Sequence, residues 1–218
     1  MTRAVIFVNG NIPNLESVRK LIRPGDTLLA ADGGTQHIIA LGLVPSIVIG
    51  DADSLTEDIQ RRLDESGAEI RRHPRDKNET DFELTLHYAV EAGFGEILVV
   101  AALGNRLDQT LGNLSLLTDP SLAQLDIRMD DGVEQVWFAC KQTKVDGHRG
   151  DIVSLIPWGR EVTGVTTVGL RWPLQGETLY PYKTRGISNE LLGETASLSL
   201  KSGLLLVVHS YSGNPEQY

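Results

Sequence analysis

Several aspartates directly follow short apolar stretches of this chain, and their carboxylates could bind a cation or take part in catalysis. Asp32 is followed by Gly33, and Asp51 and Asp53 lie two residues apart in a second short loop. Two carboxylates at this spacing can both turn toward one ligand, and without a cation they would repel each other. Oxygen ligands of this kind suit Mg²⁺, whose coordination is usually completed by water and substrate phosphates.

Two further segments add charged groups of both signs. Asp81 closes the acidic segment 76–81, and Arg106 stands two residues before Asp108 in the segment 104–109. An arginine can hold phosphate oxygens, and glycines beside such residues let backbone N–H groups approach a phosphate. The combination favours a site for Mg²⁺ and a polyphosphate.

Each acidic residue also has a purely structural interpretation. Ser54 and Glu57 fit a capping box that would place Asp53 just before a helix, and Thr80 and Glu83 fit another. An acid in the first turn of a helix is favoured by the helix macrodipole, whatever its function. The four acidic segments together, rather than any one of them, favour the ligand site.

The first 130 residues alternate short Val- and Ile-rich stretches with helical patterns. The expected strands are 4–8, 27–31, 47–49 and 97–102. The expected helices are 15–22, 35–41, 55–66, 82–92 and 107–117. In the last helix the leucines at 107, 111, 114 and 117 should share one face. The pattern predicts an N-terminal α/β domain, 1–130, with a mostly parallel sheet flanked by helices. Ligands bind outside the carboxyl ends of strands in such sheets, which is where the acids lie.

The remaining residues, 131–218, show no helical period of useful length. Short stretches rich in Val, Thr and Leu are separated by Gly, Pro and Asn. The expected strands are 152–156, 162–170, 178–182, 196–200 and 204–209. This half is predicted to form a C-terminal all-β domain, a sandwich or barrel.

Composition excludes several classes of function. The chain has 218 residues and a net charge of −9, which argues against bulk binding to nucleic acid or to an anionic membrane. The single cysteine, Cys140, excludes an internal disulfide framework and is expected to be a buried small side chain. There is no P-loop, no dinucleotide fingerprint and no apolar run near the roughly 20 residues that a bilayer requires. We expect a cytoplasmic protein that acts on small molecules.

Seven short motifs occur in an order and spacing that resembles the thiamine pyrophosphokinase (thiamine diphosphokinase) family over nearly the whole chain. They are DGG at 32–34, GDADS at 50–54, DKNETD at 76–81, GNRLDQ at 104–109, SLIP at 154–157, GLRWPL at 169–174 and GISNE at 186–190. Each motif alone is weak, whereas seven in order across two domains are specific.

The resemblance implies an enzyme that transfers a pyrophosphoryl group from ATP to the hydroxyl of thiamine, giving thiamine diphosphate and AMP, with Mg²⁺ as cofactor. It implies a homodimer with its sites at the subunit interface. Residues 1–130 would be the nucleotide- and Mg-binding catalytic domain, and residues 131–218 would be a thiamine-binding β-sandwich.

The resemblance also implies roles for individual residues. The Mg²⁺ ligands would be Asp51, Asp53 and Asp81, and these three together with Asp108 would form the catalytic set. The nucleotide contacts would be Asp32, Gly33, Asn105 and Arg106. The thiamine contacts would be Trp172, which would stack on a ring, Ser188 and Asn189. Trp172 has an alternative place in the sandwich core, because tryptophan is highly buried on average. No residue stands out as a general base.

Three positions depart from the family pattern. Asn78 stands where a further Asp is often found, Asn105 where a second Gly is common, and Gln109 where His is frequent. Asn78 removes one negative charge from the acidic segment, which would weaken metal binding without abolishing it. Two alternatives to a thiamine pyrophosphokinase stay open. One is a non-catalytic thiamine- or nucleotide-binding protein, and the other is a pyrophosphokinase that acts on a different heterocyclic alcohol.

Overall fold

The computed structural model describes residues 3–104 and 106–212 of the chain. The predicted nucleotide contact Asn105 therefore lies outside the described residues. Contacts within the chain divide it into two compact units, Met1–Gly132 and Val133–Tyr218. Within the residues described, no helix is both long enough and apolar enough to cross a membrane.

The first unit contains a parallel six-stranded sheet. Its strands are β1 (Arg3–Phe7), β2 (Thr27–Ala31), β3 (Ile47–Gly50), β4 (Glu69–Arg72), β5 (Glu96–Val100) and β6 (Asp126–Asp130). The order across the sheet is β6-β5-β1-β2-β3-β4, and every neighbouring pair is parallel. The chain builds outward from β1 through β4 and then returns to the other side of β1 with β5. The order therefore reverses between β1 and β5, which is where ligands bind in open α/β sheets.

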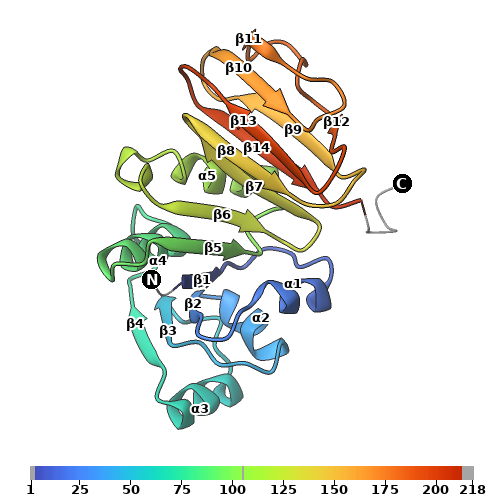
Figure 1. Ribbon diagram of the computed structural model, residues 1–218. Coiled ribbons are helices and arrows are strands. Elements are labelled where there is room, and N and C mark those ends of the chain that lie inside the picture. Colours follow the sequence, from blue (N-terminus) through green and yellow to red (C-terminus); the bar gives the residue numbers. More distant parts are fainter. Residues whose placement is uncertain (1–2, 105, 213–218) are drawn as a thin grey trace. The chain divides into compact units, whose positions relative to one another are not determined.

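Helices cover both faces of this sheet. They are α1 (Leu15–Leu21), α2 (Gly34–Ala40), α3 (Glu57–Ser66), α4 (Asp81–Glu91) and α5 (Leu107–Leu116), followed by the short 3₁₀ helix η1 (Pro120–Leu122). Residues of α1, α2 and α3 share one core cluster with alternate residues of β1, β2, β3 and β5. Helix α4 contacts β1, β2 and β3, and Figure 1 shows it on the opposite side of the sheet from α1 and α2. The predicted α/β class is confirmed.

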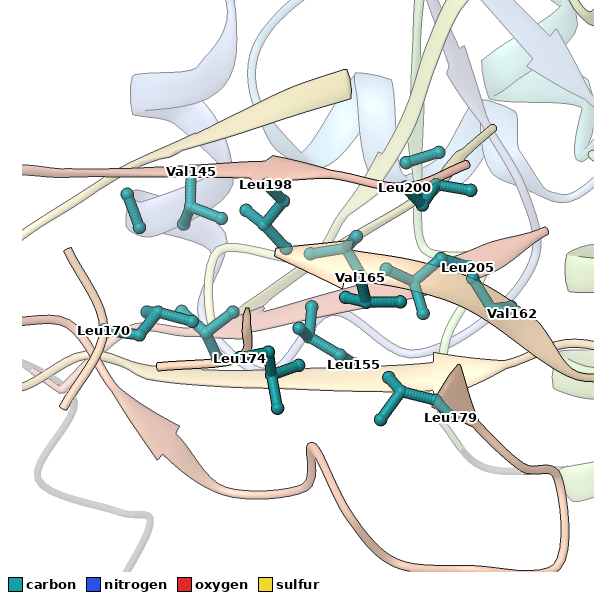
Figure 2. Close-up of a cluster of buried hydrophobic side chains, with 14 of the residues drawn as sticks. Val145, Leu155, Val162, Val165, Leu170, Leu174, Leu179, Leu198, Leu200 and Leu205 are labelled. Carbon is teal, nitrogen blue, oxygen red and sulfur yellow. The ribbon is translucent and has the colours of Figure 1, made fainter. Parts of the chain in front are cut away.

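The second unit is a sandwich of two antiparallel sheets. Its strands are β7 (Glu134–Ala139), β8 (Gln142–Asp146), β9 (Ile152–Pro157), β10 (Val162–Val168), β11 (Gln175–Leu179), β12 (Asn189–Glu190), β13 (Thr195–Ser199) and β14 (Leu205–Ser210). One sheet has the order β12-β9-β14-β7 and the other β11-β10-β13-β8. Alternate residues of both sheets meet in one apolar core, which includes Leu155, Val165, Leu198 and Leu205 (Figure 2). Of the two predicted all-β forms, the chain adopts the sandwich.

One expectation about a single residue, Cys140, is wrong, and the leucine face of α5 is buried only in part. Leu107 and Leu111 are exposed, because the buried part of α5 is its C-terminal half, where Leu114 lies. Cys140 is exposed rather than buried. It lies with Lys141 in the short connection that carries the chain from β7 in one sheet to β8 in the other.

Candidate active site

Three carboxylates converge at the carboxyl ends of β2 and β3. One side-chain oxygen from each of Asp32, Asp51 and Asp53 lies within 4.8 Å of the other two. The Asp32 N–H donates to the carbonyl of Ile49 at 2.9 Å, which ties the end of β2 to β3. The Asp53 N–H donates to Oδ1 of Asp51 at 3.1 Å, which folds the second loop tightly. Two of the three predicted metal ligands therefore lie together, and Asp32, predicted as a nucleotide contact, lies with them.

The third predicted metal ligand, Asp81, approaches the same place from the start of α4. Thr80 caps this helix by accepting from the Glu83 N–H at 3.1 Å, as the predicted capping box requires. A Cβ on Gly50 would lie 2.8 Å from the Asp32 Cβ and 3.2 Å from Oδ1 of Asp81. Only glycine therefore fits at Gly50, and its lack of a side chain lets Asp32 and Asp81 pack close together.

Ser54 contributes to this cluster in a way that its sequence does not indicate. The predicted capping box at Ser54 is wrong, because Thr56 is the residue that caps α3. The Ser54 hydroxyl donates instead to Oδ1 of Asp32 at 3.0 Å. Ser54 is thus a supporting residue of the acidic cluster.

The electrostatics of the cluster differ from one acid to the next. Burial raises the pKa of Asp32, and the neighbouring carboxylates of Asp51 and Asp81 raise it further. The pKa of Asp51 is lowered, chiefly by the hydrogen bond from the Asp53 N–H, with help from the positive charge of Lys77. Oδ1 of Asp81 is buried and accepts no directed hydrogen bond from a described residue, although Lys77 Nζ lies 2.9 Å away as an ion pair. A cation that binds several oxygens would relieve this arrangement.

A cavity of about 320 Å³ lies where the strand order of the sheet reverses. Its lining comes from the ends of β1 and β5 and from α5, namely Val8, Asn9, Gly10, Ala101, Ala102, Gly104, Arg106, Gln109 and Asn113. Buried Asn113 donates from Nδ2 to the Ala102 carbonyl at 2.9 Å, which fixes this polar side chain in the wall. A Cβ added at Gly33 would lie only 2.5 to 2.6 Å from side-chain atoms of Asn9, so the cavity adjoins the Asp32 loop.

Arg106 and Asp108 form a pair at the start of α5. The guanidinium donates from Nε to Oδ1 of Asp108 at 3.2 Å and from Nη2 to Oδ2 at 2.5 Å. This hydrogen bonding lowers the pKa of Asp108. Both side chains are exposed, and Arg106 also lines the cavity. The structure thus places Asp108 with Arg106, whereas Asp32, Asp51 and Asp53 form the carboxylate group.

The backbone is strained just after β2, β3 and β5, at the edge of the sheet where the carboxylates and the cavity lie. Asp32, Ala52 and Ala101 have φ values of 41°, 61° and 58°, and they follow β2, β3 and β5. Among the described non-glycine residues, the fourth with positive φ is Ser188, at 54°. Such conformations cost roughly 1–3 kcal/mol each and cluster at functional sites. Sequence could not reveal them, because these residue types rarely adopt this conformation.

Of the predicted thiamine residues, Trp172 lies in the loop between β10 and β11, and Ser188 and Asn189 lie at the start of β12. Trp172 is 49% exposed, which excludes its alternative place in the sandwich core. The backbone N–H of Trp172 donates to Oδ1 of Asn189 at 3.0 Å, and Nδ2 of Asn189 donates back to the Trp172 backbone carbonyl at 2.8 Å. Asn189 is buried and its amide is used within the protein, so it holds the Trp172 loop. The Ser188 N–H donates to the Ser154 hydroxyl at 3.0 Å, and Ser188 itself is exposed.

Three residues at the site are not indicated by the sequence patterns. The pattern around Ser54 predicts a helix cap, and Lys77 lies within an acidic segment. Asn113 is a buried polar residue on the face of α5 that carries Leu114, and this break in the apolar pattern is the signal that could have revealed it.

Comparison with known proteins agrees with the fold and the motifs. The family model for the thiamin pyrophosphokinase catalytic domain matches residues 18–130, and the model for the thiamin pyrophosphokinase vitamin B1 binding domain matches residues 141–205. A thiamine pyrophosphokinase of Bacillus subtilis is 27% identical over 184 residues, which cover 84% of this chain and 86% of that protein. Thiamine pyrophosphokinase 1 of rice (Oryza sativa subsp. japonica) is 24% identical and covers 94% of this chain and 86% of its own.

Solved structures show the same architecture. The crystal structure of a thiamin pyrophosphokinase from Geobacillus thermodenitrificans superposes with a TM-score of 0.83 and 26% identity, covering 98% of this chain and 99% of that one. The thiamine pyrophosphokinase structure from Bacillus subtilis gives a TM-score of 0.86 at 24% identity, covering 97% of this chain and all of that one, and shows the shared fold. Because the two models together cover most of the sequence, this chain belongs to the thiamin pyrophosphokinase family.

Proposed function

We propose that this chain transfers a pyrophosphoryl group from ATP to the hydroxyl of thiamine in a Mg²⁺-dependent reaction that gives thiamine diphosphate and AMP. The observation that carries the proposal is the convergence of Asp32, Asp51 and Asp53 at the sheet edge, in a member of this family. The adjoining cavity offers space for part of a nucleotide. The first unit would thus bind ATP and metal, and the second would bind thiamine.

The acidic residues fit a magnesium ion. Carboxylate oxygens are the ligands that Mg²⁺ prefers, and Oδ1 of Asp81 is buried without a directed hydrogen bond. Asp51, Asp53 and Asp81 would hold the ion, with Asp32 beside them. When bound, the ion would offset the negative charge of the ATP phosphates.

The cavity and its rim would hold the nucleotide. Arg106 can donate to phosphate oxygens from a planar guanidinium, and Asp108 holds that guanidinium at the start of α5. Asn113 and Gln109 supply polar groups in the cavity wall. In the transfer, the thiamine hydroxyl oxygen bonds to the β-phosphorus and gives up its proton to solvent, and the bond from that phosphorus to the α,β-bridging oxygen breaks, so AMP leaves. The protein would contribute mainly positioning and charge neutralisation.

Thiamine would contact the loops around Trp172. An aromatic face attracts a cationic ring, and Trp172 is half exposed on a loop whose backbone is held by hydrogen bonds to the Asn189 side chain. We further propose that the chain acts as a homodimer. Large apolar side chains that the sandwich leaves exposed support this part of the proposal, and they are Val168, Trp172, Tyr180, Tyr182, Ile187 and Leu192.

The test is to separate the nucleotide products of ATP with and without thiamine, in Mg²⁺ and in excess EDTA. The proposal expects AMP and thiamine diphosphate in equal amounts, only when thiamine and Mg²⁺ are both present. ADP with thiamine monophosphate would show transfer of a single phosphoryl group. Saturable thiamine binding without AMP would identify a binding protein, and neither binding nor AMP would point to another acceptor alcohol. Each of these three results would contradict the proposal.

A further inference from the structure

The loop between β4 and α4 places an ammonium group among the carboxylates. Nζ of Lys77 lies 2.9 Å from Oδ1 of Asp81 and donates to the Pro74 carbonyl at 3.2 Å. The Lys77 side chain is only 14% exposed, which is unusual for a lysine. Its positive charge also acts on the Asp51 carboxylate. Lys77 therefore lies inside the acidic cluster rather than at its rim.

The ammonium and a metal ion would compete for the same atom. Oδ1 of Asp81 is buried, and the Lys77 ammonium forms an ion pair with it. If a divalent ion bound that oxygen while Lys77 stayed in place, two positive charges would lie a few Å apart in a partly buried site, where their repulsion is strong. Without either cation, four carboxylates from three loops would repel one another.

We propose that Lys77 is the internal counter-ion of the acidic loops, which holds them together when no divalent cation is bound and leaves Asp81 when one binds. This inference rests on the metal site of the proposed function. It assigns to Lys77 a positioning role in the metal-free protein and makes release of its ammonium a part of cation binding.

The same loop offers a matched control. Arg75 carries the same charge and lies 3.6 Å from Oδ2 of Asp53, but its side chain is 85% exposed. Solvent screens such a pair, so Arg75 should contribute little. Substitution of either residue by methionine removes one positive charge from the loop, and only Lys77→Met removes the ammonium that occupies Asp81.

The first experiment measures Mn²⁺ affinity of the nucleotide-free protein by calorimetry. Removal of the competing ammonium should make Lys77→Met bind Mn²⁺ at least about fivefold more tightly than wild type, whereas Arg75→Met should change the affinity by less than about twofold. An unchanged or weaker affinity in Lys77→Met would overturn the inference alone. A wild type that binds no Mn²⁺ would overturn the metal site of the proposed function and the inference with it.

The second experiment uses the wild-type protein, so it does not depend on the folding of a variant. Lysines are acylated with a water-soluble ester, and the extent of labelling at each lysine is measured by mass spectrometry. Mg²⁺ alone should increase the labelling rate of Lys77 at least about threefold, because a paired, buried ammonium becomes accessible. The exposed Lys20 on α1 serves as the internal control and should not change. Equal labelling of Lys77 with and without Mg²⁺, in a protein that binds Mn²⁺, would refute the inference that a divalent cation displaces the Lys77 ammonium from Asp81.

Discussion

Two shielded carboxyl groups, Asp32 in the first unit and Asp151 in the second, have opposite surroundings. Asp151 accepts hydrogen bonds from the His148 N–H, from His209 Nε2, and from both the N–H and the hydroxyl of Ser212, all between 2.7 and 2.9 Å. Burial alone would raise its pKa, but these bonds outweigh burial and hold the pKa at about 2. Asp32 receives one side-chain hydrogen bond, from Ser54, so burial raises its pKa and two neighbouring carboxylates raise it further.

The difference shows that burial of a carboxylate does not by itself indicate function. Asp151 has its partners within the fold, and it ties β9 to the end of β14, so it stabilises the second unit. Asp32 and the carboxylates around it have fewer such partners, and the backbone is strained at Asp32 and Ala52. Their unfavourable surroundings are explained if a ligand completes them, and this contrast can be tested residue by residue.

The largest effect on activity should come from Asp51→Asn. The variant keeps the oxygen that accepts from the Asp53 N–H, so the loop should stay folded, but it removes a charged metal ligand. We expect kcat/KM for thiamine-dependent AMP formation to fall at least about 100-fold, which corresponds to about 2.7 kcal/mol. Steady-state kinetics beside a thermal melt would check this. Activity within about threefold of wild type would remove Asp51 from the site.

The next effect should be the loss of stability in Asp151→Asn. The shift of the Asp151 pKa from 3.8 to about 2 corresponds to about 2 kcal/mol of folding free energy above pH 4. All three tryptophans lie in the second unit, so urea unfolding followed by tryptophan fluorescence reports on the relevant part of the chain. The exposed Asp146 on β8 provides the control, and Asp146→Asn should change little. Equal stability of the two variants would show that the Asp151 hydrogen bonds contribute nothing.

The stabilisation by Asp151 should depend on pH in a defined direction. Because the folded-state pKa is below the ordinary value, the contribution is fully present above about pH 4 and disappears as the pH falls toward 2. The difference in unfolding free energy between wild type and Asp151→Asn should therefore shrink across this window. Urea unfolding of both proteins at pH 6, 4 and 3 would measure how this difference changes with pH. A difference that stays constant down to pH 3 would contradict the assigned pKa.

Trp172→Ala should affect binding rather than stability, in contrast to Asp151→Asn in the same unit. Trp172 is half exposed, whereas Trp137 is 3% exposed in the core. We expect a thiamine KM about tenfold higher, with kcat and the melting temperature nearly unchanged. A matched Trp137→Ala variant should instead lose about 3–5 kcal/mol of stability. A similar loss of stability in Trp172→Ala would show that Trp172 is structural.

The smallest effect is expected in Asp32→Asn, and it should be an increase in stability. Removal of one charge relieves the repulsion from Asp51 and Asp81, and an asparagine oxygen can still accept from Ser54. The metal-free protein at pH 7 should melt about 1–3 °C higher, because ionisation of a group with a raised pKa destabilises the fold above that pKa. Differential scanning calorimetry in EDTA would measure it. A lower melting temperature would mean that the charge of Asp32 is already compensated.

Much of the first unit could be predicted because its inner strands are continuous apolar runs. Strands β1, β2, β3 and β5 were all expected close to their observed bounds. Strands β4 and β6 were missed, because their sequences, EIRR and DIRMD, carry charges that a strand buried on both faces would not have. The convergence of Asp32 with Asp51 and Asp53 followed from their place behind neighbouring parallel strands.

What sequence could not supply is the pairing of side chains across loops. The Ser54 hydroxyl could serve a helix or Asp32, and both choices fit its neighbours in the chain. Lys77 in an acidic segment would ordinarily be a solvated charge, and only the fold shows its ammonium against Asp81. In the second unit, β11 begins at Gln175 rather than near residue 178, because its outward residues are polar and give no clear period.

The most direct measurement is the melting temperature of wild type and Asp51→Asn over a Mn²⁺ titration without nucleotide. If the acidic loops form a metal site, the wild type should gain about 2.7 kcal/mol of stability at one hundred times its dissociation constant, and Asp51→Asn should gain little over the same range. An equal rise in both proteins would place the metal elsewhere. It would leave the strained, charged edge of the sheet without the ligand that explains it.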